Sequence, residues 1–119
     1  MKILIVAALV ALSQQLPTGA PAGTPSEAQV QRARTALDGQ MLDYPSARFR
    51  QVRADGYRIC GLVNGKNALG AYSGWKAFGI LDTPQRALLH IDEPSMTEVI
   101  CTRALLATST DYSDRLTHR

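Results

Sequence analysis

Residues 57–78 read YRICGLVNGKNALGAYSGWKAF, and the predicted fold is built outward from them. Two apolar runs flank a connection rich in glycine and asparagine, a pattern typical of an antiparallel hairpin. We expect strands over 57–63 and 72–81, joined by a polar loop over residues 64–71. The stretch also holds the single tryptophan, Trp75, and one of the two cysteines, Cys60.

One further strand is expected on each side of this hairpin. Residues 49–54 read as a strand with poor alternation, and they lead into Asp55-Gly56, a dipeptide that favours a tight hairpin turn because glycine accepts a positive φ. Residues 86–92 alternate apolar and polar side chains, as in a half-buried strand. The four runs together predict an antiparallel meander.

Helices are expected at both ends of the meander. A capped segment over about 25–41 has one apolar stripe, and a capping box over 95–98 begins a second helix that carries Cys101. Two amphipathic helices need one core. We therefore predict an α+β fold with an N-terminal helix, a three- to four-stranded antiparallel meander and a C-terminal helix packed on the same face, all in one domain over 23–119. The polar tail after about residue 108 is expected to fray.

The N-terminal residues follow the order of a secretory signal peptide. Lys2 supplies a positive start, residues 3–12 are an unbroken apolar run, and residues 20–22 (APA) fit the small-x-small cleavage pattern. The apolar run is shorter than the about 20 residues that span a bilayer, and its alternative reading is a strand or buried helix. We expect residues 1–22 to be removed and the protein to be periplasmic or secreted rather than membrane-spanning.

Export would make a disulfide available. Cys60 and Cys101 are the only cysteines, so an oxidising compartment allows one intramolecular pairing. A bridge that closes a loop of about 40 residues is worth roughly 4 kcal/mol in the chain-entropy model. That is a large share of the stability of a small domain.

Composition argues against several classes of site. His90 and His118 are the only histidines, too few for a zinc site with the two cysteines at this spacing, and neither a nucleophile elbow nor a P-loop is present. We expect no metal and no cofactor. The 13 basic and 10 acidic residues give too mild an excess to require nucleic acid. Four arginines nevertheless lie close together in the sequence: Arg48, Arg50, Arg53 and Arg58. They indicate either a solvated strand face or a site for an anionic partner.

The central stretch carries a longer pattern, C-G-x-V-N-x-K-N-x-x-G-x-Y-x-G-W-x-x-F, over residues 60–78. This pattern resembles the signature of a group of small exported bacterial proteins. In that group an acid-Pro-Ser-Ala-Lys/Arg-Phe run comes just before, and residues 43–49 (DYPSARF) are similar to it with Tyr44 inserted. The resemblance implies export and a shared fold, and it implies no particular activity.

The hairpin loop is the candidate site. Amide and ammonium donors beside an aromatic ring suit recognition of a sugar, peptide or protein, so we predict a binding module for such a partner in the cell envelope. The recognition surface would comprise Asn64, Lys66, Asn67 and Tyr72, on a protein expected to be a monomer. One alternative is a small enzyme that uses Lys66 with the two asparagines and a carboxylate. Another is a purely structural loop, with the function elsewhere.

The two aromatic residues after the loop differ in their expected roles. In a regular strand, Tyr72 and Trp75 point to opposite faces. They share one surface only if Gly74 marks a bulge, as glycine within a strand often does. We expect Trp75 to pack in the core.

The leader can be tested directly. If residues 1–22 are removed on export, the intact mass of the exported protein corresponds to an N-terminus near Gly23. Recovery of the full-length chain from the cytoplasm, with none exported, would contradict the assignment.

Overall fold

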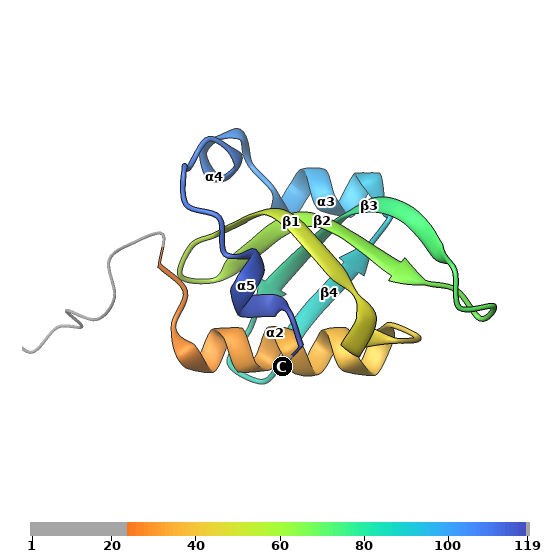
Figure 1. Ribbon diagram of the computed structural model, residues 1–119. Helices are drawn as coiled ribbons and strands as arrows, with labels where there is room; N and C mark the ends of the chain where they lie inside the picture. Colours follow the sequence, from red (N-terminus) through yellow and green to blue (C-terminus); the bar gives the residue numbers. More distant parts are fainter. Residues whose placement is uncertain (1–23, 119) are drawn as a thin grey trace, which may run out of the picture.

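The computed structural model of the chain describes residues 24–118, in which helices lie on both sides of a four-stranded antiparallel sheet (Figure 1). The strand order is β1-β2-β3-β4, which confirms the α+β class and the antiparallel meander. The expected signal peptide lies outside the described residues. The elements are α2 (Glu27–Gln40), η1 (Tyr44–Ser46), β1 (Arg48–Ala54), β2 (Arg58–Lys66), β3 (Tyr72–Asp82), β4 (Ala87–Ile91), α3 (Pro94–Ile100), α4 (Arg103–Leu106) and α5 (Ser113–Leu116).

A bulge explains the poor alternation of β1. Gln51 has a φ of 54°, and the register with β2 shifts between Arg50 and Arg53. The extra residue keeps Phe49 and Val52 on the face that packs against α2, although they are three residues apart. The arginines at 48, 50 and 53 consequently share the other face.

The C-terminal segment holds this bulge in place. The Asp111 carboxylate accepts hydrogen bonds from the amides of Gln51 (3.2 Å) and Val52 (3.1 Å). Burial acts to raise the pKa of Asp111, but these bonds and those from Ser113 outweigh it and lower that pKa. The carboxylate therefore contributes stability at neutral pH, which is lost as the pH falls through its lowered pKa.

The two main helices lie on opposite faces of the sheet, so the prediction that both pack on the same face is wrong (Figure 1). Ile59 belongs to the core beneath α2, whereas its neighbour Cys60 packs with Ile100 of α3. Successive side chains of a strand point to opposite faces, so these two contacts cannot lie on one side. Gly79 leaves room for α3, since a Cβ there would lie 3.3 Å from the sulfur of Cys101.

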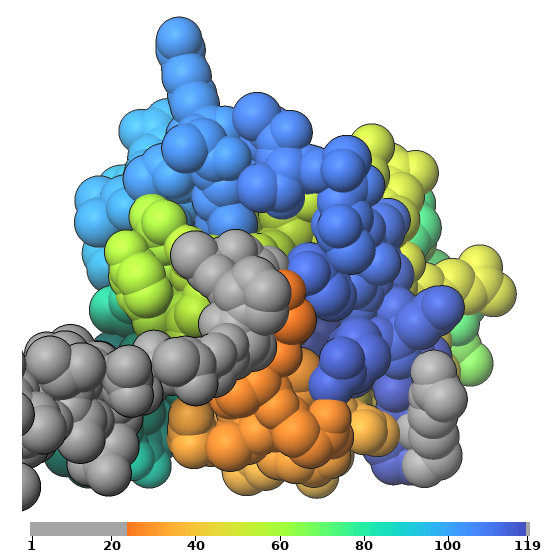
Figure 2. Space-filling view, turned by 90° about the vertical axis from the view of Figure 1, so that its left-hand side faces the viewer, coloured from red at the N-terminus to blue at the C-terminus, as the bar shows by residue number. Residues whose placement is uncertain are grey.

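The tail is packed, contrary to the expectation that it frays after residue 108. Its last helix, α5, returns to the α2 side of the sheet, where Leu116 is 1% exposed within the main core. The Tyr44 hydroxyl donates a hydrogen bond to the carbonyl of Leu116, and the Tyr112 amide donates one to Val52 at 2.9 Å. Figure 2 shows this segment running across one end of the molecule, from the α3 and α4 region down to α2.

The disulfide is confirmed. Cys60 of β2 and Cys101, at the end of α3, are bonded, with Cα atoms 5.9 Å apart and a sequence separation of 41. The bridge attaches α3 to the sheet on the face away from α2. The second core there is small, since it comprises Cys60, Ile100 and Leu105 with partly buried neighbours.

Reduction should therefore release α3 and destabilise the domain. We expect the free energy of unfolding to fall by roughly 4 kcal/mol, as chain entropy predicts for a loop of this size. That loss corresponds to a melting temperature about 15–30 °C lower, measured by circular dichroism with and without reductant. A Cys60→Ala/Cys101→Ala variant is the control, because reductant must leave its melting temperature unchanged. Two titratable thiols in the native protein would contradict the assignment.

Candidate functional site

The predicted site residues all lie on the β2–β3 hairpin, which projects beyond the helices (Figure 1). The strands are longer than expected, because β2 continues to Lys66. Asn64 and Lys66 are therefore strand residues, and Tyr72 opens β3 opposite Lys66. The connection is confined to residues 67–71.

The two asparagines hold the hairpin together. The Asn67 side-chain oxygen accepts hydrogen bonds from the amides of Leu69 (2.9 Å) and Ala71 (3.1 Å). The Asn64 side-chain oxygen accepts one from the amide of Gly74 at 3.0 Å. Such local bonds are a common use of asparagine at turns. Both oxygens thus have partners within the hairpin, as the structural alternative for this loop proposed.

Gly74 does mark a bulge, and this places Tyr72 and Trp75 on the same face. Its φ is +105°, and the register between β2 and β3 shifts there, so that Tyr72 pairs with Lys66 and Trp75 pairs with Asn64. Opposite residues of an antiparallel pair point to the same side. Trp75 is 37% exposed, so the expectation that it packs in the core is wrong.

Arginines of β1 stack on both aromatic rings across the sheet. The guanidinium carbon of Arg48 lies 4.2 Å from the centre of the Tyr72 ring, and that of Arg50 lies 4.2 Å from the Trp75 ring. The Lys66 ammonium lies 5.5 Å from the Tyr72 ring. We call this surface the open face, and it comprises Arg48, Arg50, Asn64, Lys66, Tyr72 and Trp75.

Two of the four clustered arginines have a carboxylate partner and two do not. Arg53 lies 3.9 Å from Asp111, and Arg58 lies 2.6 Å from Asp55. Within residues 24–118, no carboxylate lies in ion-pair distance of the arginines at 48 and 50 or of Lys66. The sequence explains this, since no acidic residue occurs between Asp55 and Asp82. The open face therefore carries uncompensated positive charge.

The anchoring of Tyr72 fixes the geometry of the open face. Its hydroxyl donates a hydrogen bond to the carbonyl of Ser46 at 2.8 Å, which ties the hairpin to η1. Its ring is in turn contacted by Arg48 and Lys66. Tyr72 thus positions two cations, while its own hydroxyl is engaged.

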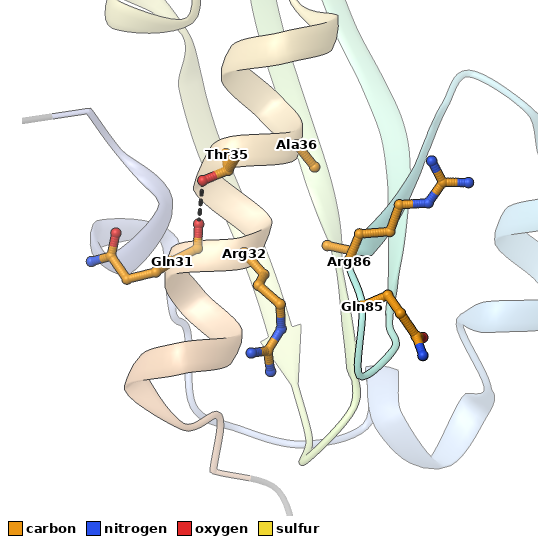
Figure 3. Close-up of a pocket in the computed structure, with 7 residues that line it drawn as sticks. Gln31, Arg32, Thr35, Ala36, Gln85 and Arg86 are labelled. Atoms are coloured by element: carbon orange, nitrogen blue, oxygen red, sulfur yellow. Dashed lines mark hydrogen bonds between the residues drawn. The ribbon is translucent and has the colours of Figure 1, made fainter.

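A hollow of about 380 Å³ between α2 and the β3–β4 turn is a weaker candidate (Figure 3). Arg32 on one wall donates two hydrogen bonds, each 2.7 Å, to the Asp82 carboxylate, so its charge is already compensated. Arg86 on the other wall points in a different direction from Arg32 (Figure 3). The two cations do not converge on a common point.

Other site classes find little support in the described part of the chain. No group of three or more His, Cys, Asp or Glu side chains is placed to hold a metal ion there. None of its helices has both the length and the apolar character to cross a bilayer. For the enzyme alternative, Lys66 faces an aromatic ring, without the carboxylate that this mechanism was expected to use.

The position of Trp75 can be tested by comparing two large-to-small substitutions in β3. Trp75→Ala is expected to lower the free energy of unfolding by only about 1 kcal/mol, the value of an exposed cation–π contact. Phe78→Ala removes a ring that is 1% exposed and should cost about 3–5 kcal/mol. Urea denaturation of both variants gives the comparison. Equal losses would place Trp75 in the core.

No protein-family model matches the chain, and no match was found among curated proteins or solved structures. Sequence reasoning had named Lys66 and Tyr72 and noted the arginines. It missed the pairing of arginine with aromatic rings, which depends on the bulge at Gly74.

Proposed function

We propose that the protein is an exported binding module whose open face holds an anionic partner. The observation that carries the proposal is the pair of arginine–aromatic stacks, Arg48 on Tyr72 and Arg50 on Trp75, on an exposed sheet surface where no carboxylate of residues 24–118 forms an ion pair with either arginine. The disulfide supports an oxidising compartment, since such bonds persist outside the reducing cytosol.

The stacks make the arginines suited to binding. A guanidinium is planar, and when its face rests on a ring its N–H groups remain free at the edge. Those groups can donate two parallel hydrogen bonds to a carboxylate, phosphate or sulfate. Because the ring already restricts Arg50 and Arg48, less side-chain entropy is lost when an anion binds.

The hairpin supports this role by holding the cations at fixed positions. Lys66 extends the positive surface toward the tip, and the bonds made by Asn64 and Asn67 stabilise the strands that carry it. The proposed surface keeps Asn64, Lys66 and Tyr72 of the surface expected from the sequence, assigns Asn67 to the turn, and has its centre nearer Arg50 and Trp75. The partner is a molecule of the cell envelope whose acidic groups contact this surface. The protein binds it as a monomer.

A matched pair of charge reversals tests the proposal. Arg50→Glu and Arg86→Glu change the net charge equally, at exposed positions on and away from the open face. On immobilised heparin, used as a polyanion, Arg50→Glu should weaken binding about tenfold or more, since hydrogen bonds to charged groups are worth about 1.5–3 kcal/mol. Arg86→Glu should have a much smaller effect.

Elution salt and melting temperature are the two readouts. Arg86→Glu should melt within a few degrees of the unsubstituted protein, because exposed substitutions change stability by less than about 0.5 kcal/mol. Arg50→Glu also loses its contact with the Trp75 ring, so it should remain folded with a free energy of unfolding about 1 kcal/mol lower. Equal weakening by both variants would mean that binding follows net charge alone, and the open face would lose its special role.

A further inference from the structure

We infer that the anionic partner is a lipid bilayer, and that the β2–β3 hairpin docks on its surface with Leu69 inserted among the headgroups. This inference rests on the function proposed above and names the partner of the same surface. Its evidence is the exposed leucine at the tip of the hairpin, because anion binding alone does not explain an apolar side chain there.

The tip presents an apolar side chain to solvent. Leu69 is 92% exposed in the connection between β2 and β3, with the small residues Ala68 and Gly70 on either side. The turn is well ordered by hydrogen bonds, since the Asn67 amide donates to Ala71 at 2.8 Å and the Gly70 amide donates to Asn67 at 3.0 Å. The structure therefore holds a leucine outward at a fixed place, where it contributes nothing to the core.

Cationic and aromatic residues follow directly behind the tip. Lys66 and Tyr72 end the two strands and are each three residues from Leu69, so their Cα atoms lie at most about 10 Å from that of Leu69, the reach of three fully extended residues. Apolar groups of interfacial proteins enter the headgroup and acyl boundary by about 5–10 Å. Insertion of Leu69 would thus bring the Lys66 ammonium to the level of the lipid phosphates.

Charge surrounds the hairpin rather than lying on one side. Lys76 pairs with Val63, a residue of the main core, so it lies on the face opposite Lys66. The arginines at 48 and 50 add charge on the open face, and anionic headgroups attract such residues near a surface. Trp75 and Tyr72 have the amphipathic rings that favour the membrane–water interface.

This arrangement favours a bilayer over a soluble polyanion. A polyanion would use the cations, but it offers no apolar layer for Leu69. A bilayer with anionic lipids offers both, in the order in which the hairpin presents them: leucine first, then cations and aromatic rings.

The single tryptophan provides the assay, because Trp75 lies on the docking surface. Vesicles of phosphatidylcholine with about one-third phosphatidylglycerol should shift Trp75 emission to shorter wavelength and sediment with the protein, as expected when an indole enters an interface. Vesicles of phosphatidylcholine alone should bind at least tenfold more weakly. Equal binding to both vesicles would overturn the role of the cations.

Leu69→Ser is the decisive variant, and Val99→Ser is its control. Val99 is 73% exposed on α3, away from the hairpin, so both substitutions remove a similarly exposed apolar side chain. Leu69→Ser should weaken binding to the anionic vesicles about tenfold, in line with the value of burying a leucine, and Val99→Ser should leave it unchanged. All variants are compared in the same chain form, so any contribution of residues 1–22 is common to them.

The outcomes separate this inference from the proposed function. If Leu69→Ser loses vesicle binding and keeps heparin binding, the hairpin insertion is supported. If the protein binds heparin through Arg50 but ignores anionic vesicles, the lipid assignment is wrong and the open face still binds anions. If Leu69→Ser binds vesicles as well as the unsubstituted protein, insertion of the tip is overturned.

Discussion

The hydrogen bonds from the amides of Gln51 and Val52 to Asp111 hold the bulge that decides which face of the sheet each side chain of β1 points to. A shift of one residue moves every following side chain of a strand to the other face. Without the bulge, Val52 would turn away from the core beneath α2, and Arg53 would lie on the opposite face from Arg48 and Arg50. The packing of β1 on the core therefore depends on this bulge, as the shared face of Tyr72 and Trp75 depends on the bulge at Gly74. Asp111 is about sixty residues away in sequence from the bulge of β1. The geometry of β1 therefore depends on the C-terminal segment.

The same segment directs binding toward the face of the sheet. Edge strands offer unpaired backbone groups that other chains can use. Asp111 and the Tyr112 amide occupy such groups along the outer side of β1. On β4, the Gln40 side chain donates to the carbonyl of Leu89 at 3.3 Å. Because the chain itself occupies some backbone groups on both edge strands, a partner is less favoured to add a strand there than to contact the open face.

The sequence was sufficient for the order of elements, because each strand and its turn is encoded locally. Asp55, for example, accepts hydrogen bonds from the amides of Tyr57 and Arg58, as expected of a residue that begins a hairpin turn. The side of α3 was also contained in the sequence, since Cys60 follows the apolar Ile59 and must point the other way. The packing of the tail was not, because the partner of Asp111 is a bulge that no local pattern reveals.

The hairpin separates the residues that shape it from those that can bind. Gly61 faces Val52 and Phe78 so closely that a Cβ would lie 2.9 Å from the Val52 side chain. Asn64 and Asn67 accept hydrogen bonds from backbone amides, and Gly74 has the positive φ of the bulge. All of these residues belong to the pattern recognised in the sequence. The exposed arginines, the tryptophan and the leucine at the tip contribute little to the core. Since the fold does not require those side chains, their positions on the open face and at the hairpin tip are best explained by a partner.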